Sequence, residues 1–101
     1  MRDIDQNEMR KRLWVNSKIL EVFGKYNFSI VDSSPIEHLE TLEAKSGPLI
    51  RDEIYWFEDK AQRKLALRFD LTVGLARMVT ARADTILPMK LSAISNMWRY
   101  D

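Results

Sequence analysis

The chain has 101 residues, the length of one small domain, and its 46% hydrophobic and 31% charged residues are typical of a soluble globular protein. Sixteen basic and fifteen acidic residues are intermixed and give a formal charge of +1, which argues against a module built mainly to grip nucleic-acid phosphates. Without cysteine there is no disulfide framework or thiolate metal site, and without a secretory leader or a membrane-length apolar run the cytoplasm is the expected location.

The N-terminal part of the sequence predicts a long amphipathic helix that begins near Asp5 and ends at Gly24. Asp5 is placed to cap this helix, and Glu8 stands where a capping box has its glutamate. The apolar residues that share its face are Met9, Leu13, Val15, Ile19, Leu20, Val22 and Phe23. They span about half of the circumference. So broad a face needs cover on more than one side, and we expect the helix to lie against a sheet and to meet a second chain.

The rest of the chain predicts alternating strands and helices. In order, these are a strand over 28–37 that Pro35 stops, a short helix over 38–45, a hairpin with strands over 53–59 and 65–69, a helix to about residue 82, and a last strand over 89–101. Strands joined by a short polar turn pair antiparallel, so the predicted fold class is α+β, with helices packed on an antiparallel sheet. The chain stops at Asp101 within an apolar strand, and the open strand predicts that it is part of a longer domain.

Two predicted strands carry an arginine followed two residues later by an aspartate. Arg68 and Asp70 share one strand face, and Arg99 and Asp101 share another, each pair about 6.6 Å apart. A guanidinium suits a phosphate because its planar fork donates two hydrogen bonds, and a carboxylate suits a ligand ammonium. If both faces line one cleft, with Thr72 adding a hydroxyl, the cleft would suit a substrate with an amine and a phosphate.

The same residues have ordinary structural interpretations. From spacing alone, Asp70 is more often a helix N-cap, Arg99 a surface cation, and Arg68 either a structural ion-pair partner, which we favour, or a pocket residue. His38 is the only histidine and has no cysteine to complete a metal site, so no metal ligand is predicted.

Three segments resemble the front of the catalytic domain of histidyl-tRNA synthetases, a class II aminoacyl-tRNA synthetase family. They are "KRLWVNSKILEVFGKYNFSIVDSSPIEHLETLEAKSG", "IYWFEDKAQRKLALRFDLT" and "MWRYD", in that order. The resemblance covers nearly the whole chain and implies that 1–101 is part of a class II catalytic domain. Motif 1, the homodimer interface, would span about 7–35, the histidine-binding strand, turn and helix about 65–82, and the first strand of motif 2 about 91–101.

The resemblance also implies roles for single residues. Asp70 would bind the histidine α-amino group with help from Thr72. Arg99 would be the catalytic cation that holds the ATP α-phosphate and the histidine carboxylate, while Asp101 would face the adenine amino group. Attack of that carboxylate on the α-phosphorus then gives histidyl-adenylate in an ATP- and Mg²⁺-dependent step that precedes tRNA charging. Phe69 stands where proline is commoner, and Asp101 replaces the usual glutamate.

The loop of motif 2, motif 3, the later catalytic arginine and the anticodon-binding domain would all lie beyond residue 101. We therefore expect this chain alone to be inactive in aminoacylation or only to bind ligands weakly, with tRNA contacted by parts of the parent enzyme absent here. Two alternatives are a synthetase-like regulatory subunit of ATP phosphoribosyltransferase and a dimerisation module without a ligand. Intact Asp70, Thr72 and Arg99 argue against the first.

Overall fold

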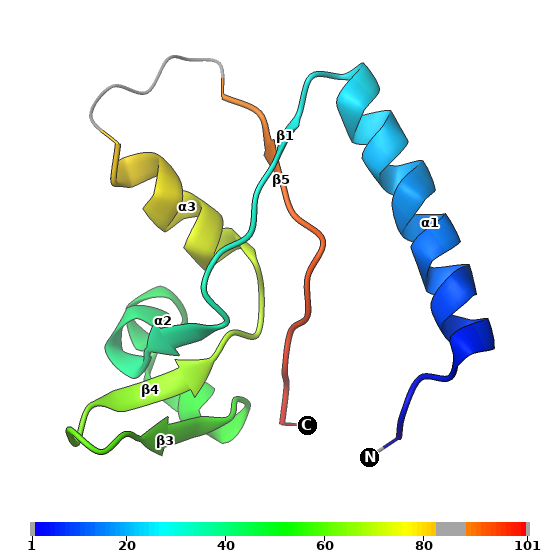
Figure 1. Ribbon diagram of the computed structural model, residues 1–101. Helices are drawn as coiled ribbons and strands as arrows, with labels where there is room; N and C mark the ends of the chain where they lie inside the picture. Colours follow the sequence, from blue (N-terminus) through cyan, green and yellow to red (C-terminus); the bar gives the residue numbers. More distant parts are fainter. Residues whose placement is uncertain (1, 83–88, 101) are drawn as a thin grey trace. The chain divides into compact units, whose positions relative to one another are not determined.

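The computed structural model describes residues 2–82 and 89–100 (Figure 1). Its chain divides into two compact units, which are taken one at a time. The first consists of Met1–Val31 with Ile86–Ile94, and the second of Asp32–Thr85 with Ser95–Asp101.

The first unit is dominated by helix α1 (Gln6–Lys25), which begins where the sequence predicted. The Asp5 side chain accepts a hydrogen bond of 2.9 Å from the backbone N–H of Glu8, so Asp5 is the N-cap. In the expected capping box the Glu8 carboxylate would accept from the backbone N–H of Asp5. It binds the Arg2 guanidinium instead, at 2.9 and 3.0 Å. None of the 20 residues of α1 is buried.

The C-terminal end of α1 leads into a small parallel sheet. The helix runs one residue past Gly24, and Asn27 then takes a left-handed conformation with φ 63°, which asparagine tolerates well. Strand β1 (Ser29–Ile30) pairs in parallel with β5 (Leu91–Ser92). The sequence did not predict this pairing, because two-residue strands are too short to show an alternation of apolar and polar residues.

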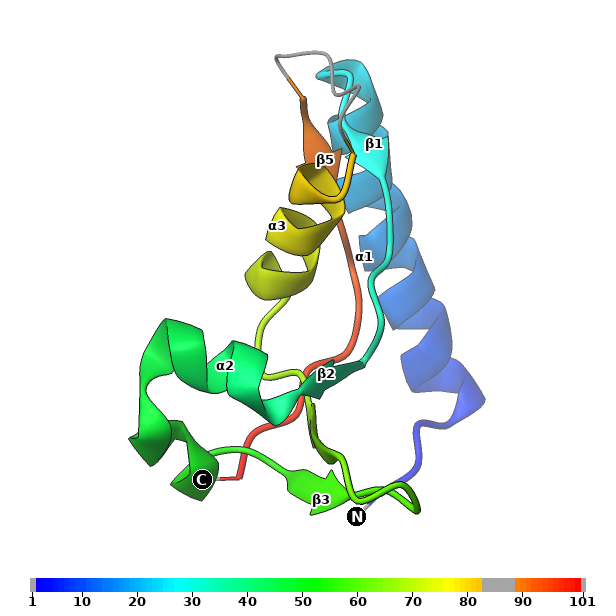
Figure 2. The same ribbon diagram turned by 90° about the vertical axis from the view of Figure 1, so that its left-hand side faces the viewer.

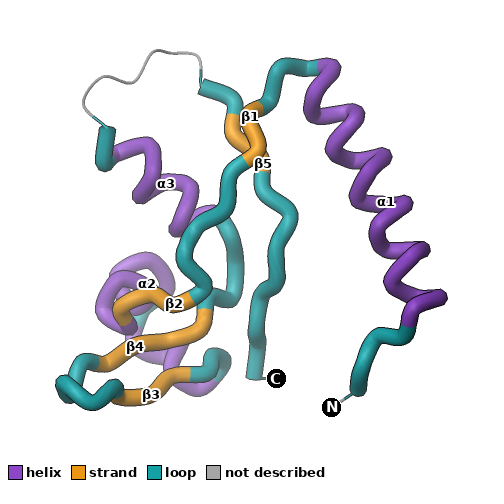
Figure 3. Tube along the Cα trace, viewed as in Figure 1, coloured by secondary structure: helices purple, strands orange, loops and turns teal. Residues whose placement is uncertain are grey.

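The second unit contains the antiparallel sheet that the sequence predicted. Its strands are β2 (Ile36–His38), β3 (Trp56–Glu58) and β4 (Lys64–Leu67), and β4 lies in the middle (Figure 3). The hairpin of β3 and β4 is confirmed, with Trp56 opposite Ala66. The single strand expected to end at Pro35 is wrong in its bounds, since β2 begins immediately after that proline.

One hydrophobic core holds the second unit together. Helix α2 (Leu39–Ser46) follows β2 directly, as Figure 2 shows, and packs against β4 and against the 3₁₀ helix η1 (Pro48–Asp52). The buried core residues are Leu39, Leu42, Ile50, Ile54 and Ala66, with Phe69 and Val73 packed against them. Phe69 and Val73 flank Asp70, so the core fixes the backbone on both sides of that carboxylate.

The last segment of the chain is extended but forms little regular sheet. Within residues 89–100, the described part of the predicted strand over 89–101, only β5 forms a ladder. Beyond it, the Trp98 N–H donates to the Arg68 carbonyl at 3.0 Å and the Tyr100 N–H donates to the Glu53 carbonyl at 2.9 Å. These two bonds hold the segment that carries Arg99 beside the end of β4.

Helix α3 (Thr72–Thr80) approaches the loop before β2 so closely that only glycine fits at one position. A Cβ on Gly74 would lie 2.3 Å from Ser33 Oγ and 2.6 Å from Ser33 Cβ. We expect Gly74→Ala to destabilise the protein by about 1–3 kcal/mol, because this overlap outweighs the roughly 1 kcal/mol that alanine gains over glycine in a helix. Urea unfolding would measure the change.

The matched control is Gly24→Ala in α1, where nothing lies within 4 Å of an added Cβ. It should leave stability unchanged or raise it slightly through helix propensity. Equal effects of the two substitutions would contradict the close approach of Gly74 to Ser33.

Candidate functional site

A cluster of polar side chains forms where β4 turns into α3. The Lys45 ammonium, from the last turn of α2, makes an ion pair with Asp70 Oδ2 and donates a hydrogen bond of 3.1 Å to Thr72 Oγ1. The Thr72 hydroxyl donates to Asp70 Oδ2 at 3.2 Å. Lys45 Nζ also lies 5.5 Å from the centre of the Phe69 ring. The structure thus brings Asp70 and Thr72 together, as predicted.

Lys45 was not predicted from the sequence. The signal available was indirect: a partly enclosed carboxylate such as Asp70 needs a cation, and Lys45 is the basic residue at the end of the predicted short helix. Nothing in the sequence alone says that this helix ends beside Asp70, because the two residues are 25 positions apart.

The two oxygens of the Asp70 carboxylate have different surroundings. Oδ2 binds Lys45 and Thr72, whereas Oδ1 is buried and makes no hydrogen bond of standard geometry with any residue in 2–82 or 89–100. Asp70 is also not the N-cap of α3, since Leu71 holds that position and no side chain caps the helix. A buried acceptor without a donor is costly in a folded protein and marks a place where a ligand donor would be favourable.

The environment keeps the Asp70 carboxylate ionised. Burial would raise its pKa, but the hydrogen bond and charge of Lys45 outweigh this, with smaller contributions from the Val73 backbone N–H and the Thr72 hydroxyl. The pKa of Asp70 therefore lies below its usual value. At neutral pH the carboxylate is an acceptor only, as a ligand ammonium requires.

Lys45→Met should change how the protein responds to acid. Because the pKa of Asp70 is lowered in the folded state, its stabilising contribution is complete above the ordinary pKa of 3.8 and is lost as the pH falls through the lower, folded value. Without Lys45, burial is the largest remaining influence and the pKa rises, so the carboxylate should take up its proton at higher pH, and the loss of stability in acid that this group causes should shrink or reverse. Carbon-13 NMR of the Asp70 carboxyl would follow the titration.

Lys18→Met is the control for this titration. Lys18 also faces a carboxylate, that of Glu21, at 3.8 Å, but both side chains are more than half exposed and lie on α1. This substitution should leave the Asp70 titration unchanged. An Asp70 pKa unaffected by Lys45→Met would exclude Lys45 as its main counter-ion.

Arg68 has the structural role favoured from the sequence. Its side chain is only 6% exposed, and Nε donates to the Asn96 carbonyl at 2.8 Å. One terminal nitrogen donates to the Ser33 carbonyl at 2.9 Å and the other to Ser95 Oγ at 2.5 Å. A weaker contact of 3.4 Å reaches Asp32. The alternative interpretation, in which Arg68 would line one cleft with Asp70, is therefore wrong, since the Arg68 guanidinium makes its hydrogen bonds inside the protein.

Arg99 lies beside the backbone next to Asp70. Its Nε donates to the Phe69 carbonyl at 3.4 Å, a long hydrogen bond. With Phe69, Glu53, Ile50 and Ile54, it lines a pocket of about 370 Å³. This pocket has an apolar floor, one cation and one carboxylate. Glu53 was not singled out from the sequence, and Asp101 lies outside the described residues.

Residues 2–82 and 89–100 contain neither a bilayer-crossing helix nor a metal-binding cluster. No helix among them combines the length and the apolar composition needed to cross a bilayer. Nor do three acidic or histidine side chains in these ranges come close enough together to hold a metal ion.

A family model and the curated relatives identify the family. A family model described as histidyl-tRNA synthetase matches residues 1–101. The histidine–tRNA ligase of Arabidopsis thaliana chloroplasts and mitochondria is 39% identical over 99% of this chain and 21% of its own length. The enzyme of Thermococcus kodakarensis is 38% identical over 99% of this chain and 23% of its own.

Solved structures agree on the fold. A Bacillus halodurans chain described as an ATP phosphoribosyltransferase regulatory subunit/histidyl-tRNA synthetase has a TM-score of 0.88 at 24% identity, over 98% of this chain and 26% of its own. A histidyl-tRNA synthetase from Nostoc has a TM-score of 0.76 at 28% identity, over 92% of this chain and 22% of its own. The chain thus spans between a fifth and a quarter of the Arabidopsis and Thermococcus relatives. With a family match over its whole length and a class II fold, the chain belongs to the histidyl-tRNA synthetase family.

Proposed function

We propose that this chain carries the amino-acid-binding part of a histidine-activating catalytic domain. The observation that carries the proposal is Asp70 Oδ1, which is buried and makes no hydrogen bond of standard geometry within residues 2–82 and 89–100. The other carboxylate oxygen, Oδ2, binds Lys45 and Thr72. The α-ammonium of histidine would supply the missing donor. Thr72 assists by fixing the orientation of the carboxylate through its hydroxyl.

Arg99 is the proposed catalytic residue on the phosphate side. Nε is used on the Phe69 carbonyl, and a guanidinium has further N–H donors for an α-phosphate and a carboxylate. In adenylate formation the histidine carboxylate attacks the α-phosphorus and pyrophosphate leaves, so a fixed cation stabilises the charge that develops on the phosphoryl oxygens. Asp101 is proposed to face the adenine amino group, by family resemblance alone.

The described residues offer binding groups for ATP but no side-chain cluster for its Mg²⁺ ion. The pocket beside Arg99 offers apolar walls and a cation, which suit a nucleotide phosphate next to an apolar surface. For Mg²⁺ the described ranges offer no cluster of three ligating side chains, so the ion would be held chiefly by the ATP phosphates. Mg²⁺ supplies charge neutralisation on those phosphates when it is bound.

We further propose a homodimer through motif 1, about residues 7–35, in a cytoplasmic protein. The support is that α1 buries none of its residues and still exposes large apolar side chains, including Leu13 at 56% and Val22 at 50%. A second copy covering this face would explain its composition. A tRNA partner would be engaged by parts of the relatives that this chain does not span.

Titration calorimetry tests the ligand proposal with this chain as it stands. Histidine, ATP and a non-hydrolysable histidyl-adenylate analogue are added in turn, and the analogue should bind most tightly because it fills both the Asp70 and Arg99 positions. No heat from any of the three would leave only the dimerisation-module alternative. We expect no aminoacylation of tRNA by this chain alone, and charging at ordinary rates would contradict that expectation.

The regulatory-subunit alternative makes a different prediction in the same experiment. A histidine sensor would bind histidine without ATP or the adenylate analogue, and would form a complex with an ATP phosphoribosyltransferase. The retained Arg99 fits both proposals, because its guanidinium could bind the histidine carboxylate in a sensor, so binding of ATP and of the adenylate analogue decides between them.

A further inference from the structure

A second pocket lies at the end of α2 that is opposite to Lys45. It has a volume of about 470 Å³ and is formed by the end of β2, the start of α2, the 3₁₀ helix η1, and the hairpin turn into β4. Its polar lining residues are His38, Glu40, Arg51, Gln62, Arg63 and Lys64. None of the residues proposed for histidine or ATP belongs to this pocket, so it needs an explanation of its own.

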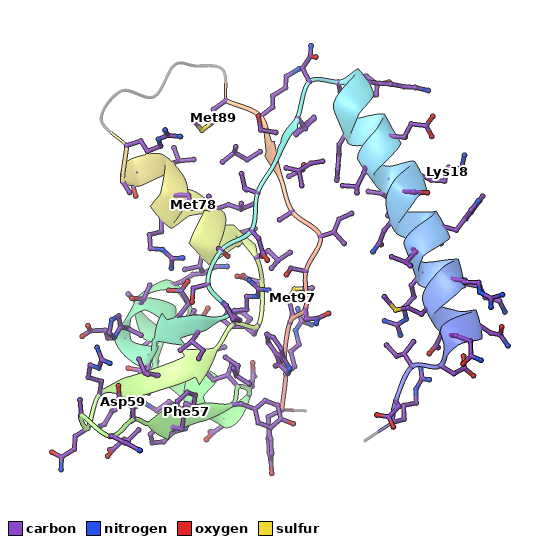
Figure 4. All side chains as sticks on the ribbon, in the orientation of Figure 1. Lys18, Phe57, Asp59, Met78, Met89 and Met97 are labelled. Carbon is purple, nitrogen blue, oxygen red and sulfur yellow. The ribbon has the colours of Figure 1, made fainter. Side chains whose placement is uncertain are left out.

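Two arginines of the pocket are held in place by carboxylates that leave most of their donors free. Arg51 binds Glu43 through Nε, and Arg63 binds Asp59 through Nε at 2.7 Å. Asp59, labelled in Figure 4, also accepts from the backbone N–H groups of Ala61 and Arg63, at 2.9 Å each. The terminal nitrogens of both guanidinium groups make no hydrogen bond with residues 2–82 or 89–100. Each arginine therefore keeps four of its five N–H donors.

The charges around this pocket balance, so what it offers an anion is the set of unused N–H donors on its cations. Lys64 has no ion-pair partner in the described part of the chain, and Glu40 is the one lining carboxylate there that opposes it. The carboxylates that hold Arg51 and Arg63 are already neutralised by their pairs. Each arginine and its carboxylate cancel in charge, so Lys64 and Glu40 are the lining charges left to balance each other. In addition, the Arg51 guanidinium lies 5.4 Å from the centre of the Trp56 ring, which restricts its movement.

We propose that this pocket binds the phosphoryl group of a small phosphorylated molecule, through the free ends of Arg51 and Arg63 and the ammonium of Lys64. Guanidinium groups whose orientation is already fixed lose little freedom on binding and donate to phosphate oxygens in pairs. A volume of about 470 Å³ exceeds the needs of a bare phosphate and lies within the range of small-molecule sites. The lining residues of this pocket include none of Asp70, Thr72 and Arg99, so this site is separate from that of Asp70.

The test is an NMR titration of the ¹⁵N-labelled chain with inorganic pyrophosphate and, separately, with adenosine monophosphate. Saturable shifts should appear at Gln62, Arg63 and Lys64 and on the Arg51 side chain. If the phosphoryl group alone is recognised, pyrophosphate suffices, and if the rest of a nucleotide adds contacts, the monophosphate binds more tightly. Either result supports the proposal.

Substitutions separate this pocket from the rest of the surface. Lys64→Gln should weaken pyrophosphate binding about fivefold, and adding Arg63→Gln should remove it, while circular dichroism stays unchanged because both side chains are exposed. Lys60→Gln is the matched control, since Lys60 lies in the same turn but does not line the pocket. Equal weakening by the control would mean non-specific attraction and would overturn the proposal.

A last variant separates this pocket from the proposed catalytic function. In Arg99→Gln, a phosphate position beside Asp70 is lost, but the shifts at residues 62–64 should persist with the same affinity. Their disappearance in this variant, or no saturable shift in the unmodified chain, would show that the pocket is not a phosphoryl site. Failure of histidine to bind would leave this result untouched.

Discussion

Arg68→Met is expected to lower the free energy of unfolding by about 3 kcal/mol or more, the largest effect on stability that we predict for a single side chain. Methionine fills similar space but leaves the carbonyls of Ser33 and Asn96 and the hydroxyl of Ser95 without their donor. Each buried polar group left unsatisfied costs about 1–3 kcal/mol. Urea unfolding followed by the fluorescence of Trp98, whose ring lies 5.9 Å from the Arg68 guanidinium carbon, would measure the loss.

Arg63→Met is the control for charge and size. Arg63 also pairs with a carboxylate, but its side chain is 63% exposed, so its loss should cost less than about 1 kcal/mol. Arg68→Lys should fall between the two, because an ammonium keeps the charge but cannot reach several partners in different directions. If Arg68→Met were as stable as the unmodified chain, the guanidinium would not be what ties the segment before Arg99 to the end of β4.

The sequence could predict the local parts of this fold because each has its own period. Alternation predicted the β3–β4 hairpin, and the change of period after Phe69 predicted α3. The Asp5 cap was also predictable, because a cap is made within a few residues of chain. The parallel pairing of β1 with β5 was not, since neither strand is long enough to carry a pattern and the partners are 62 residues apart (29 to 91).

The candidate site was predicted only in part, for a related reason. The family resemblance pointed to Asp70 and Arg99, and the structure places Arg99 against the carbonyl of Phe69. Spacing on a strand could not show that Arg68 is buried in a structural role while Asp70 belongs to the candidate site. Which of the two side chains is buried depends on the whole fold. Lys45 was missed since its contact with Asp70 is made between two elements and leaves no local pattern.

Asp70→Asn should weaken histidine binding by about 30- to 100-fold while changing the shape of the site very little. A hydrogen bond to a charged group is worth about 1.5–3 kcal/mol, and each 1.4 kcal/mol corresponds to a factor of ten. An amide keeps an acceptor oxygen but loses the charge that attracts an ammonium. Asp59→Asn, in the hairpin turn, is the same substitution outside the site and should leave histidine binding unchanged.

Histidine analogues that lack one functional group complement the Asp70→Asn substitution. Imidazole propionate has the side chain and carboxylate of histidine but lacks the α-ammonium, so it has no group for Asp70 Oδ1 to accept from. It should bind weakly, and equally, to the unmodified chain and to Asp70→Asn. Histidinol, which keeps the ammonium and lacks the carboxylate, should be as sensitive to Asp70→Asn as histidine is. If the substitution weakened imidazole propionate as much as histidine, Asp70 would act on the shape of the pocket and not on the ammonium.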